Sequence, residues 1–178
     1  FAGNIGKVQN LENIISAFLI LSNENQEKSQ LNIIGDGSHL DNLKLLSNNN
    51  SNIVFHGKKP RSDMASYYKA SDFLIISLVD EPIFSVTVPA KTQTYIAAKK
   101  PILAIINGDT ASVIQDNNLG LYADPSRINA IAALFQRCID MGQTERQNFT
   151  NENDRLLATI FNKEKTIDKL LKLVTSKD

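Results

Sequence analysis

The stretch Phe73-Leu-Ile-Ile-Ser77 is apolar at successive positions, so a strand built from it would be hydrophobic on both faces. Strands of this kind are typical of parallel sheets that helices cover on both sides. Residues 102–106, Ile-Leu-Ala-Ile-Ile, repeat the pattern. The two runs therefore predict buried strands inside an α/β domain.

Outward from these runs, short β-rich segments alternate with longer segments of helical period. Strands are expected at residues 1–5, 31–34, 53–55, 73–77, 102–106 and 120–122, and helices at 11–19, 40–46, 64–68, 110–117 and 126–141. A more polar run with one apolar stripe follows at 143–159. Such alternation is typical of βαβ units. It predicts a Rossmann-like parallel sheet of about six strands with helices on both faces, formed by residues 1–160.

Composition excludes several classes of protein. Lys plus Arg and Asp plus Glu both total 19 in the 178 residues, and this balance gives no support for nucleic-acid binding. The single cysteine, Cys138, excludes an internal disulfide and lies in a helical run, where we expect it to be buried. No apolar run reaches 18 residues and no signal peptide is recognisable, so the expected location is cytoplasmic. Because residue 1 already lies in a predicted strand, we expect the domain to be cut from a longer chain.

Loops that follow the strands are the places to search for a site, because open parallel sheets bind ligands outside the carboxyl ends of their strands. Four loops carry suggestive residues, at positions 3–10, 35–38, 56–61 and 78–91. In the first, Gly3 and Gly6 allow close backbone approach and Lys7 adds a cation. Each of the first three is also explained by an ordinary turn with solvated side chains.

The fourth loop is the strongest physical indication of a ligand. It leads into a helix expected to start near Pro89, with Lys91 in the first turn. A cation there opposes the helix dipole at a cost of roughly a few tenths of a kcal/mol, which an anionic ligand would offset. An exposed surface lysine is the alternative interpretation.

Other chemistries lack their motifs. His39, His56 and Cys138 are too far apart in the sequence to suggest a metal site. Walker, Gly-x-Gly-x-x-Gly and Gly-x-Ser-x-Gly motifs are also missing. We therefore expect neither a metal nor a cofactor.

Five segments in order resemble the C-terminal domain of retaining GT-B glycosyltransferases of the E-x7-E type, the group 1 transferases of bacterial polysaccharides and lipopolysaccharides. The segments are residues 1–18, 31–37, 53–72, 88–103 and 111–120, and they cover most of the chain. Val-Pro-Ala-Lys-Thr-Gln-Thr-Tyr, residues 88–95, is similar to an O-antigen or capsule subgroup.

The resemblance implies a donor-binding domain for a nucleotide-diphosphate sugar, with retention at the transferred sugar and a polysaccharide or lipid-linked glycan as acceptor. Lys7, Lys91 and Glu81 would act in catalysis, the two lysines by neutralising the diphosphate. The implied donor-binding residues are Gly3, Gly6, Lys7, Gly35, Gly37, His56, Gly57, Lys58, Glu81, Ser85, Val86, Thr87, Lys91, Gln93 and Thr94.

The resemblance also implies an N-terminal acceptor domain outside this sequence. A helix at 163–174, within residues 161–178, would pack against that domain. Any peripheral contact with the inner membrane would be made by that N-terminal domain. We expect residues 1–178 alone to bind nucleotide weakly and to transfer no sugar.

Departures from the family pattern bear on the ribose contact. The second glutamate of the pattern falls on Thr94, with Gln93 beside it as a substitute. The arginine and lysine usual in the first loop align with Asn4 and Gln9, and the usual glycine of a later segment with Lys99.

Two other classes remain as alternatives. A non-catalytic α/β nucleotide-binding or interaction module would suit the fold, but a receiver-like module predicts clustered acidic residues, whereas Asp36, Asp80 and Glu81 lie apart. A nucleotide-sugar epimerase or dehydrogenase would need a Gly-x-Gly-x-x-Gly turn and a Tyr-x-x-x-Lys pair, which the sequence lacks.

Overall fold

The computed structural model describes residues 1–159, 161–162, 165, 167–168 and 171–172. In these residues the strands are β1 (Leu31–Ile34), β2 (Ile53–Gly57), β3 (Leu74–Ser77), β4 (Ile102–Ile105) and β5 (Gly120–Tyr122). All observed pairings are parallel: β1 pairs with β2, and β4 pairs with β3 on one side and β5 on the other. The strands lie within about two residues of their predicted positions.

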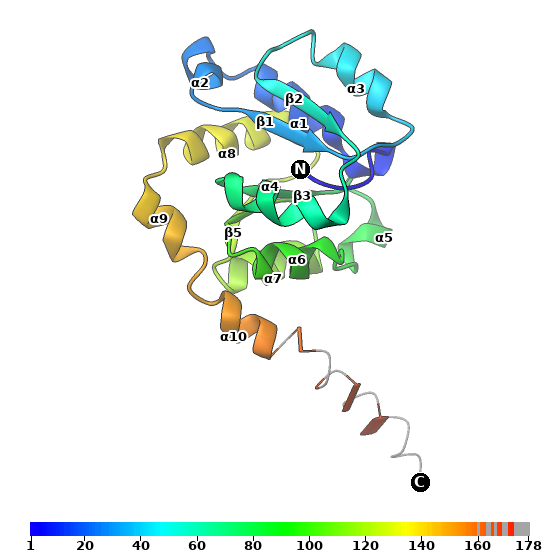
Figure 1. Cartoon of the computed structure of the whole chain (residues 1–178), viewed down its shortest axis with the longest axis vertical. Helices are drawn as coiled ribbons and strands as arrows, with labels where there is room; N and C mark the ends of the chain where they lie inside the picture. The colour runs from blue at the N-terminus through cyan, green and yellow to red at the C-terminus, as the bar shows by residue number, and fades with distance from the viewer. Residues whose placement is uncertain (160, 163–164, 166, 169–170, 173–178) are drawn as a thin grey trace.

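Helices connect the strands, as the alternation of the sequence predicts (Figure 1). They are α1 (Leu11–Leu19), α2 (Asn23–Glu27), α3 (Leu40–Leu46), α4 (Met64–Ala70), α5 (Pro82–Ser85), α6 (Lys91–Ala97), α7 (Asp109–Asp116), α8 (Ile128–Asp140), α9 (Gln143–Asn148) and α10 (Asn153–Ala158). Short 3-10 turns lie at Lys7–Gln9 and Arg61–Asp63. The brief helices α2 and α5 have no counterpart in the predicted pattern.

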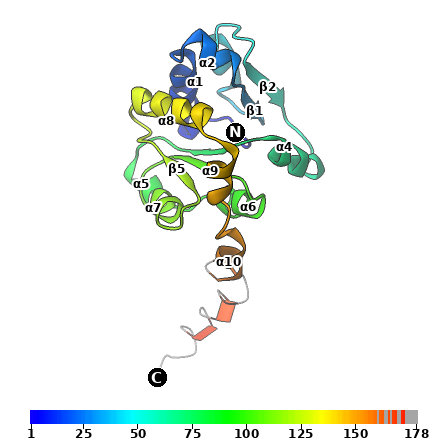
Figure 2. The same cartoon turned by 90° about the vertical axis from the view of Figure 1, so that its left-hand side faces the viewer.

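Helices cover both faces of the β3–β4–β5 sheet, as expected. Successive side chains of a strand point to opposite faces. On one face, Leu74 and Ile76 of β3 join a buried cluster with residues of α6, α7 and α10. On the other, Ile75 and Leu103 join a cluster with α1, α3 and α8. Figure 2 shows α1 and α8 packed together at one end and α6, α7 and α10 toward the other.

The expectation of one sheet of about six strands is wrong, because the five strands form two sheets. Residues 1–5 do run along β1, with Ile34 N donating to Phe1 O over 2.8 Å and Gly3 N to Ile34 O over 2.9 Å. However, they form only an isolated bridge between Ala2 and Ile34, and β3 pairs only with β4 among the described residues. Without a strand that pairs with both β1 and β3, the sheet is divided.

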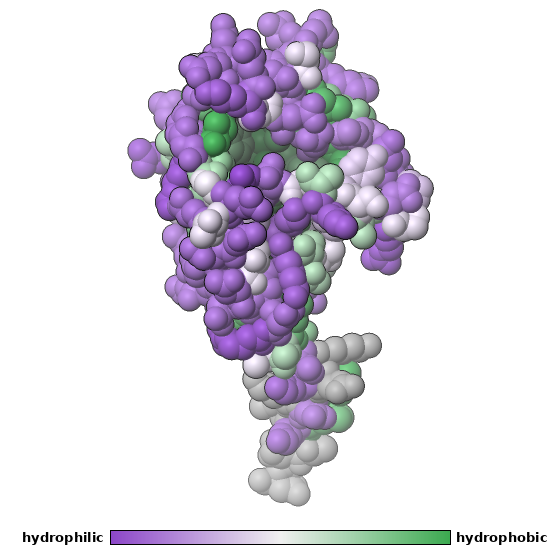
Figure 3. Space-filling model, turned by 60° about the vertical axis from the view of Figure 1, so that its left-hand side comes forward, coloured by the Kyte–Doolittle hydropathy of each residue, from purple (hydrophilic) through white to green (hydrophobic). Residues whose placement is uncertain are grey.

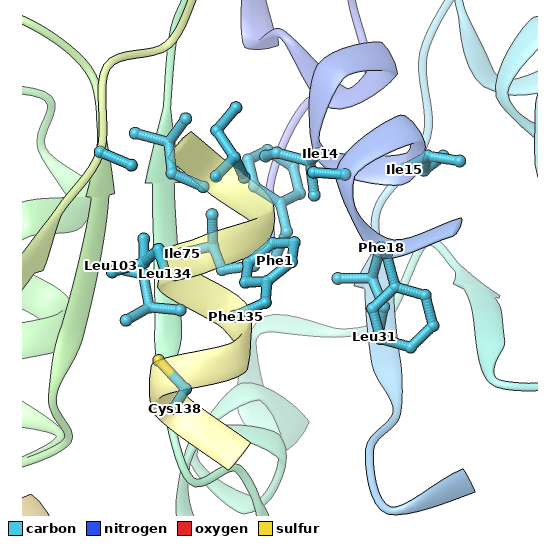
Figure 4. Close-up of a cluster of buried hydrophobic side chains, with 14 of the residues drawn as sticks. Phe1, Ile14, Ile15, Phe18, Leu31, Ile75, Leu103, Leu134, Phe135 and Cys138 are labelled. Carbon is cyan, nitrogen blue, oxygen red and sulfur yellow. The ribbon is translucent and has the colours of Figure 1, made fainter. Parts of the chain in front are cut away.

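A groove of about 700 Å³ lies where the two sheets would meet, and Figure 3 shows it as a hollow with hydrophobic side chains. Figure 4 shows several of its lining side chains: Phe18 and Leu31 lie on one side, Leu103 and Cys138 on the other, and Phe1 lies beside Phe135 between them. Cys138 is buried as predicted, and burial raises the pKa of its thiol to about 12.

Two further predictions concern the end of the chain. The polar run at 143–159 forms α9 and α10, with Leu156 fully buried against the α6 side of the sheet. The helix predicted at 163–174 falls largely outside the described residues. None of the helices in the described part of the chain is long and apolar enough to cross a bilayer.

Candidate functional site

A cleft of about 610 Å³ opens at the carboxyl ends of β1 and β2, where ligands bind in open parallel sheets. It is lined by Ala2, Gly3, Asn4, Ile34, Gly35, Asp36, Gly37, Lys58, Lys59, Met64 and Tyr68. Three loops and helix α4 thus form its walls.

Two glycines bring the loops at the base of the cleft into backbone contact. A Cβ atom on Gly35 would lie 1.8 Å from the carbonyl oxygen of Gly3, and one on Gly37 would lie 2.3 Å from that of Ile5. Gly35 also has a φ of 141°, which L side chains rarely adopt. The sequence therefore makes a surface of bare backbone, which a ligand can approach closely.

Lys91 is a cation held at the Gly3 end of the cleft. It is the first residue of α6, and its Nζ donates to the carbonyl oxygen of Ala2 over 3.2 Å. A Cβ atom on Gly3 would lie 2.9 Å from that Nζ. Burial lowers the pKa of Lys91 to about 8.

No carboxylate neutralises this lysine: Lys91 takes part in none of the ion pairs found among the described residues. A largely buried ammonium without an acidic partner loses hydration without full compensation. Lys58 and Lys59 add positive charge to the same cleft. The cleft therefore combines exposed backbone with cations, which is the chemistry that a phosphate group requires.

Two tyrosines in T-shaped ring contact support the Ala2 side of the cleft. Tyr95 is fully buried, and its ring lies at 71° to that of Tyr68 with 5.4 Å between the ring centres. The Tyr95 hydroxyl donates to the Ala2 carbonyl over 3.4 Å and accepts from the Ala2 N–H over 3.3 Å. Desolvation by burial is the largest cause that raises the pKa of Tyr95, so its hydroxyl stays protonated.

The predicted site residues separate into two groups. Gly3, Gly35, Gly37 and Lys58 line the cleft, and Lys91 reaches it at Gly3. The remaining residues proposed for donor binding are absent from its lining.

In the first loop, Gly6 and Lys7 lie beside the cleft rather than in its wall. The Gly6 N–H donates to the side chain of Gln9 over 2.9 Å, which closes the turn. Lys7 is exposed in the 3-10 turn that follows.

The side chain of His56 contacts the neighbouring strand β1 and does not line the cleft. Its Nε2 lies 2.7 Å from Oδ1 of Asn32 on β1, and its ring makes a T-shaped contact with Tyr67 of α4. Burial and the nearby Lys59 lower the pKa of His56. Gly57, which ends β2 with a φ of 66°, turns the chain toward Lys58.

Glu81 and residues 85–87 lie on an exposed loop around α5. This loop is tied to the loop after β4: Thr110 Oγ1 donates to the Thr87 carbonyl over 2.8 Å, and Gly108 lies directly against Ser85. Asn107 Nδ2 donates to Asp80 over 2.8 Å. The loop that contains Glu81 therefore lies at the carboxyl edge of β3 and is held there by these contacts with the loop after β4.

Gln93 and Thr94 are exposed on α6, one and two residues beyond the buried Thr92. Ser77 and Thr92, near the same edge of the sheet, each bury a hydroxyl without a hydrogen-bond partner. Gln93 and Thr94, in contrast, are exposed and do not pack in the core.

The family motifs did not assign seven residues that line the cleft: Ala2, Asn4, Ile34, Asp36, Lys59, Met64 and Tyr68. Asn4 and Asp36 lie within loops already singled out, so the loop signal was sufficient to find them. Met64 and Tyr68 lie on α4, where a helical apolar pattern gave no reason to expect a cleft wall. In the described residues, no cluster of three or more His, Cys, Asp or Glu could hold a metal ion.

The parallel α/β arrangement of the chain is shared with glycosyltransferases of known structure that have the GT-B fold. The C-terminal domain of a group 1 glycosyl transferase, LpcC from Francisella tularensis, superposes with a TM-score of 0.69 at 20% identity, covering 90% of this chain and 83% of that one. Anabaena Alr3699/HepE in complex with UDP gives a TM-score of 0.73 at 15% identity, covering 96% of this chain and 48% of that one.

The sequence comparisons identify the family. Residues 1–157 match the family described as glycosyl transferases group 1. "Probable glycosyltransferase WbjE" of Pseudomonas aeruginosa is 30% identical over 145 residues, which are 79% of this chain and 35% of that relative. The chain belongs to the glycosyl transferases group 1 family, and it spans about a third of the length of this curated relative.

Proposed function

We propose that the chain is the donor-binding domain of a glycosyltransferase and that its cleft holds the nucleotide diphosphate of a nucleotide-sugar. The observation that carries this proposal is Lys91, a largely buried ammonium that lies against Gly3 without an acidic partner. A diphosphate would supply the missing negative charge. Stabilising a departing diphosphate in this way lowers the barrier to glycosyl transfer.

Family membership supports the same assignment, as does the fold shared with a protein solved in complex with UDP. Uridine diphosphate is accordingly the first nucleotide to test. Lys58 and Lys59 lie in the cleft, where they would contact the nucleotide beyond the diphosphate.

Finer parts of the proposal rest on the family pattern. Transfer would proceed with retention, as in the E-x7-E type and its O-antigen or capsule subgroup, to a polysaccharide or lipid-linked glycan. Glu81 would face the donor sugar, with Lys7 beside the diphosphate. Gln93 or Thr94 would contact the ribose. No metal or cofactor is required.

An N-terminal domain of the same protein would supply the acceptor half of the cleft and any contact with the inner membrane. The protein would be cytoplasmic. Residues 1–178 alone would bind nucleotide and transfer nothing.

The test is a titration of the chain with UDP, GDP, ADP and TDP, first by thermal shift and then by NMR to millimolar concentration. A ligand at 100 times its Kd should stabilise the fold by about 2.7 kcal/mol. Lys91→Met should weaken the best nucleotide at least about tenfold, since a charge-assisted hydrogen bond contributes roughly 1.5–3 kcal/mol. Lys44→Met, on the exposed side of α3, is the matched control and should leave the Kd within about twofold.

Two outcomes would overturn the proposal. If none of the four nucleotides binds, the cleft is not a nucleotide site in this domain. If Lys91→Met and Lys44→Met bind equally well, the lysine does not contact the diphosphate, and an interaction module becomes the better interpretation.

A further inference from the structure

The Ala2 carbonyl receives hydrogen bonds from two side chains of one helix. Lys91 and Tyr95 are four residues apart on α6, so they lie on the same face. Lys91 Nζ reaches the Ala2 oxygen at 3.2 Å and the Tyr95 hydroxyl reaches it at 3.4 Å. A carbonyl oxygen has two lone pairs, so it can accept both bonds at once.

These two donors differ in what they can do next. Lys91 is the cation that the proposed function assigns to the diphosphate, and its flexible stem allows its ammonium to move. Tyr95 is fixed: it is fully buried, and its ring is packed against Tyr68. No backbone N–H in the described part of the chain donates to the Ala2 carbonyl. If Lys91 left, Tyr95 would be its remaining donor.

We propose that Tyr95 is a positioning residue of the anion site: its hydroxyl keeps the Ala2 carbonyl hydrogen-bonded when Lys91 moves to a phosphate. This inference rests on the proposed function, because it requires Lys91 to contact the ligand. Without Tyr95, the move would strand a partly buried carbonyl, and that penalty would be subtracted from the affinity. The hydroxyl also accepts from the Ala2 N–H, which fixes the backbone that leads into Gly3.

Tyr95→Phe tests this role because it removes one oxygen and retains the ring. It should weaken nucleotide binding about fivefold, the effect expected from one hydrogen bond. A merely structural tyrosine could produce the same loss, so the single variant does not suffice.

A double-mutant cycle separates the two explanations. In the Lys91→Met background, no ammonium leaves the Ala2 carbonyl on binding, so the further change Tyr95→Phe should alter the Kd by less than about twofold. If Tyr95 only maintains the fold, the same loss should appear in both backgrounds. That result would overturn the inference.

A second measurement is made on the nucleotide-saturated protein and does not require Kd values to be compared. The carbonyl carbon of Ala2, labelled with ¹³C, should shift little when the wild-type chain is saturated with UDP, because Tyr95 remains bonded. In Tyr95→Phe, saturation should shift it further, as the last side-chain donor departs. Equal shifts in the two proteins would contradict the proposal.

Failure of this inference can be distinguished from failure of the proposed function. If Lys91→Met itself leaves the Kd unchanged, the diphosphate assignment fails and this inference falls with it. If Lys91→Met weakens binding but the cycle shows no coupling, the nucleotide site stands and only the role of Tyr95 is wrong. Melting temperatures of all four proteins will show that each is folded.

Discussion

The ammonium of Lys91 lies 4.0 Å from the centre of the Phe1 ring. A cation on α6, which packs against the β3–β4–β5 sheet, thereby rests on an aromatic residue beside the other sheet. A cation over a ring face is stabilised by roughly 0.5–1 kcal/mol at an exposed site and by about 2 kcal/mol or more when desolvated. The lowered pKa of Lys91 shows that this contact does not make up for the lost hydration.

Nucleotide affinity should fall as the pH rises through the pKa of Lys91. That pKa is about 8 in the free protein, and the neutral amine formed above it attracts a diphosphate much less. The Kd for UDP should rise about tenfold between pH 7.5 and 9.5, and Lys91→Arg should flatten the profile because arginine stays charged. NMR titrations at constant ionic strength measure both. A flat wild-type profile would contradict a charged Lys91 in the complex.

The free energy of unfolding should also depend on the titration of Lys91, but it should rise with pH where the nucleotide affinity falls. The folded protein holds the Lys91 proton less tightly than the unfolded chain, whose pKa is near 10.5. Stability should therefore rise with pH between about 8 and 10.5, where the unfolded state binds more protons. Lys91→Met should be more stable than wild type at neutral pH, by up to about 3 kcal/mol. Urea unfolding of both proteins checks this, and an equally stable or weaker variant would contradict it.

The turn at Gly35 should not tolerate a side chain. A Cβ atom would lie 1.8 Å from the Gly3 carbonyl oxygen in a backbone with φ of 141°. Gly35→Ala should cost about 3 kcal/mol or more of stability. Gly142→Ala is the control: no atom lies within 4 Å of its Cβ position, and the loss should stay below about 1 kcal/mol. Equal losses would show that the close contact is absent in solution.

The loop that carries Glu81 should loosen when its tie to Thr110 is removed. Thr110 is fully buried and donates to the Thr87 carbonyl over 2.8 Å. Thr110→Val removes that bond with little change in volume and should cost about 1 kcal/mol. Hydrogen exchange should accelerate across residues 83–88. Thr150→Val, in which the lost bond is local to α9, should leave this loop unchanged.

Much of the fold could be predicted from the sequence because local signals agreed with each other. Apolar runs such as residues 102–106 placed the strands, and the helical spacing of α8 placed Cys138 in the core. The sheet itself was predicted less well. Whether residues 1–5 form a full strand depends on a partner across the groove. The hydrophobic pattern helps to set the register of a strand but does not say which strand it pairs with.

The candidate site was predictable in its loops and less so in its geometry. Gly35, Gly37 and Lys58 follow strands directly, so the rule for open sheets located them. Tyr68 and Tyr95 gave no such signal: Tyr68 fell in a predicted helix and Tyr95 only in the segment at residues 88–95. Their ring and hydroxyl contacts become visible only in the packing of α6 against α4 and Ala2.

The position of Lys91 also implies that two directed-evolution selections, one for stability and one for nucleotide binding, would favour different residues at position 91. A library sorted for thermostability alone should replace this lysine with methionine or another apolar residue, because its ammonium loses hydration and gains no carboxylate. A library sorted for retention on an immobilised nucleotide should keep it. Comparing the two populations at residue 91 would show whether the domain retains a destabilising charge for its ligand.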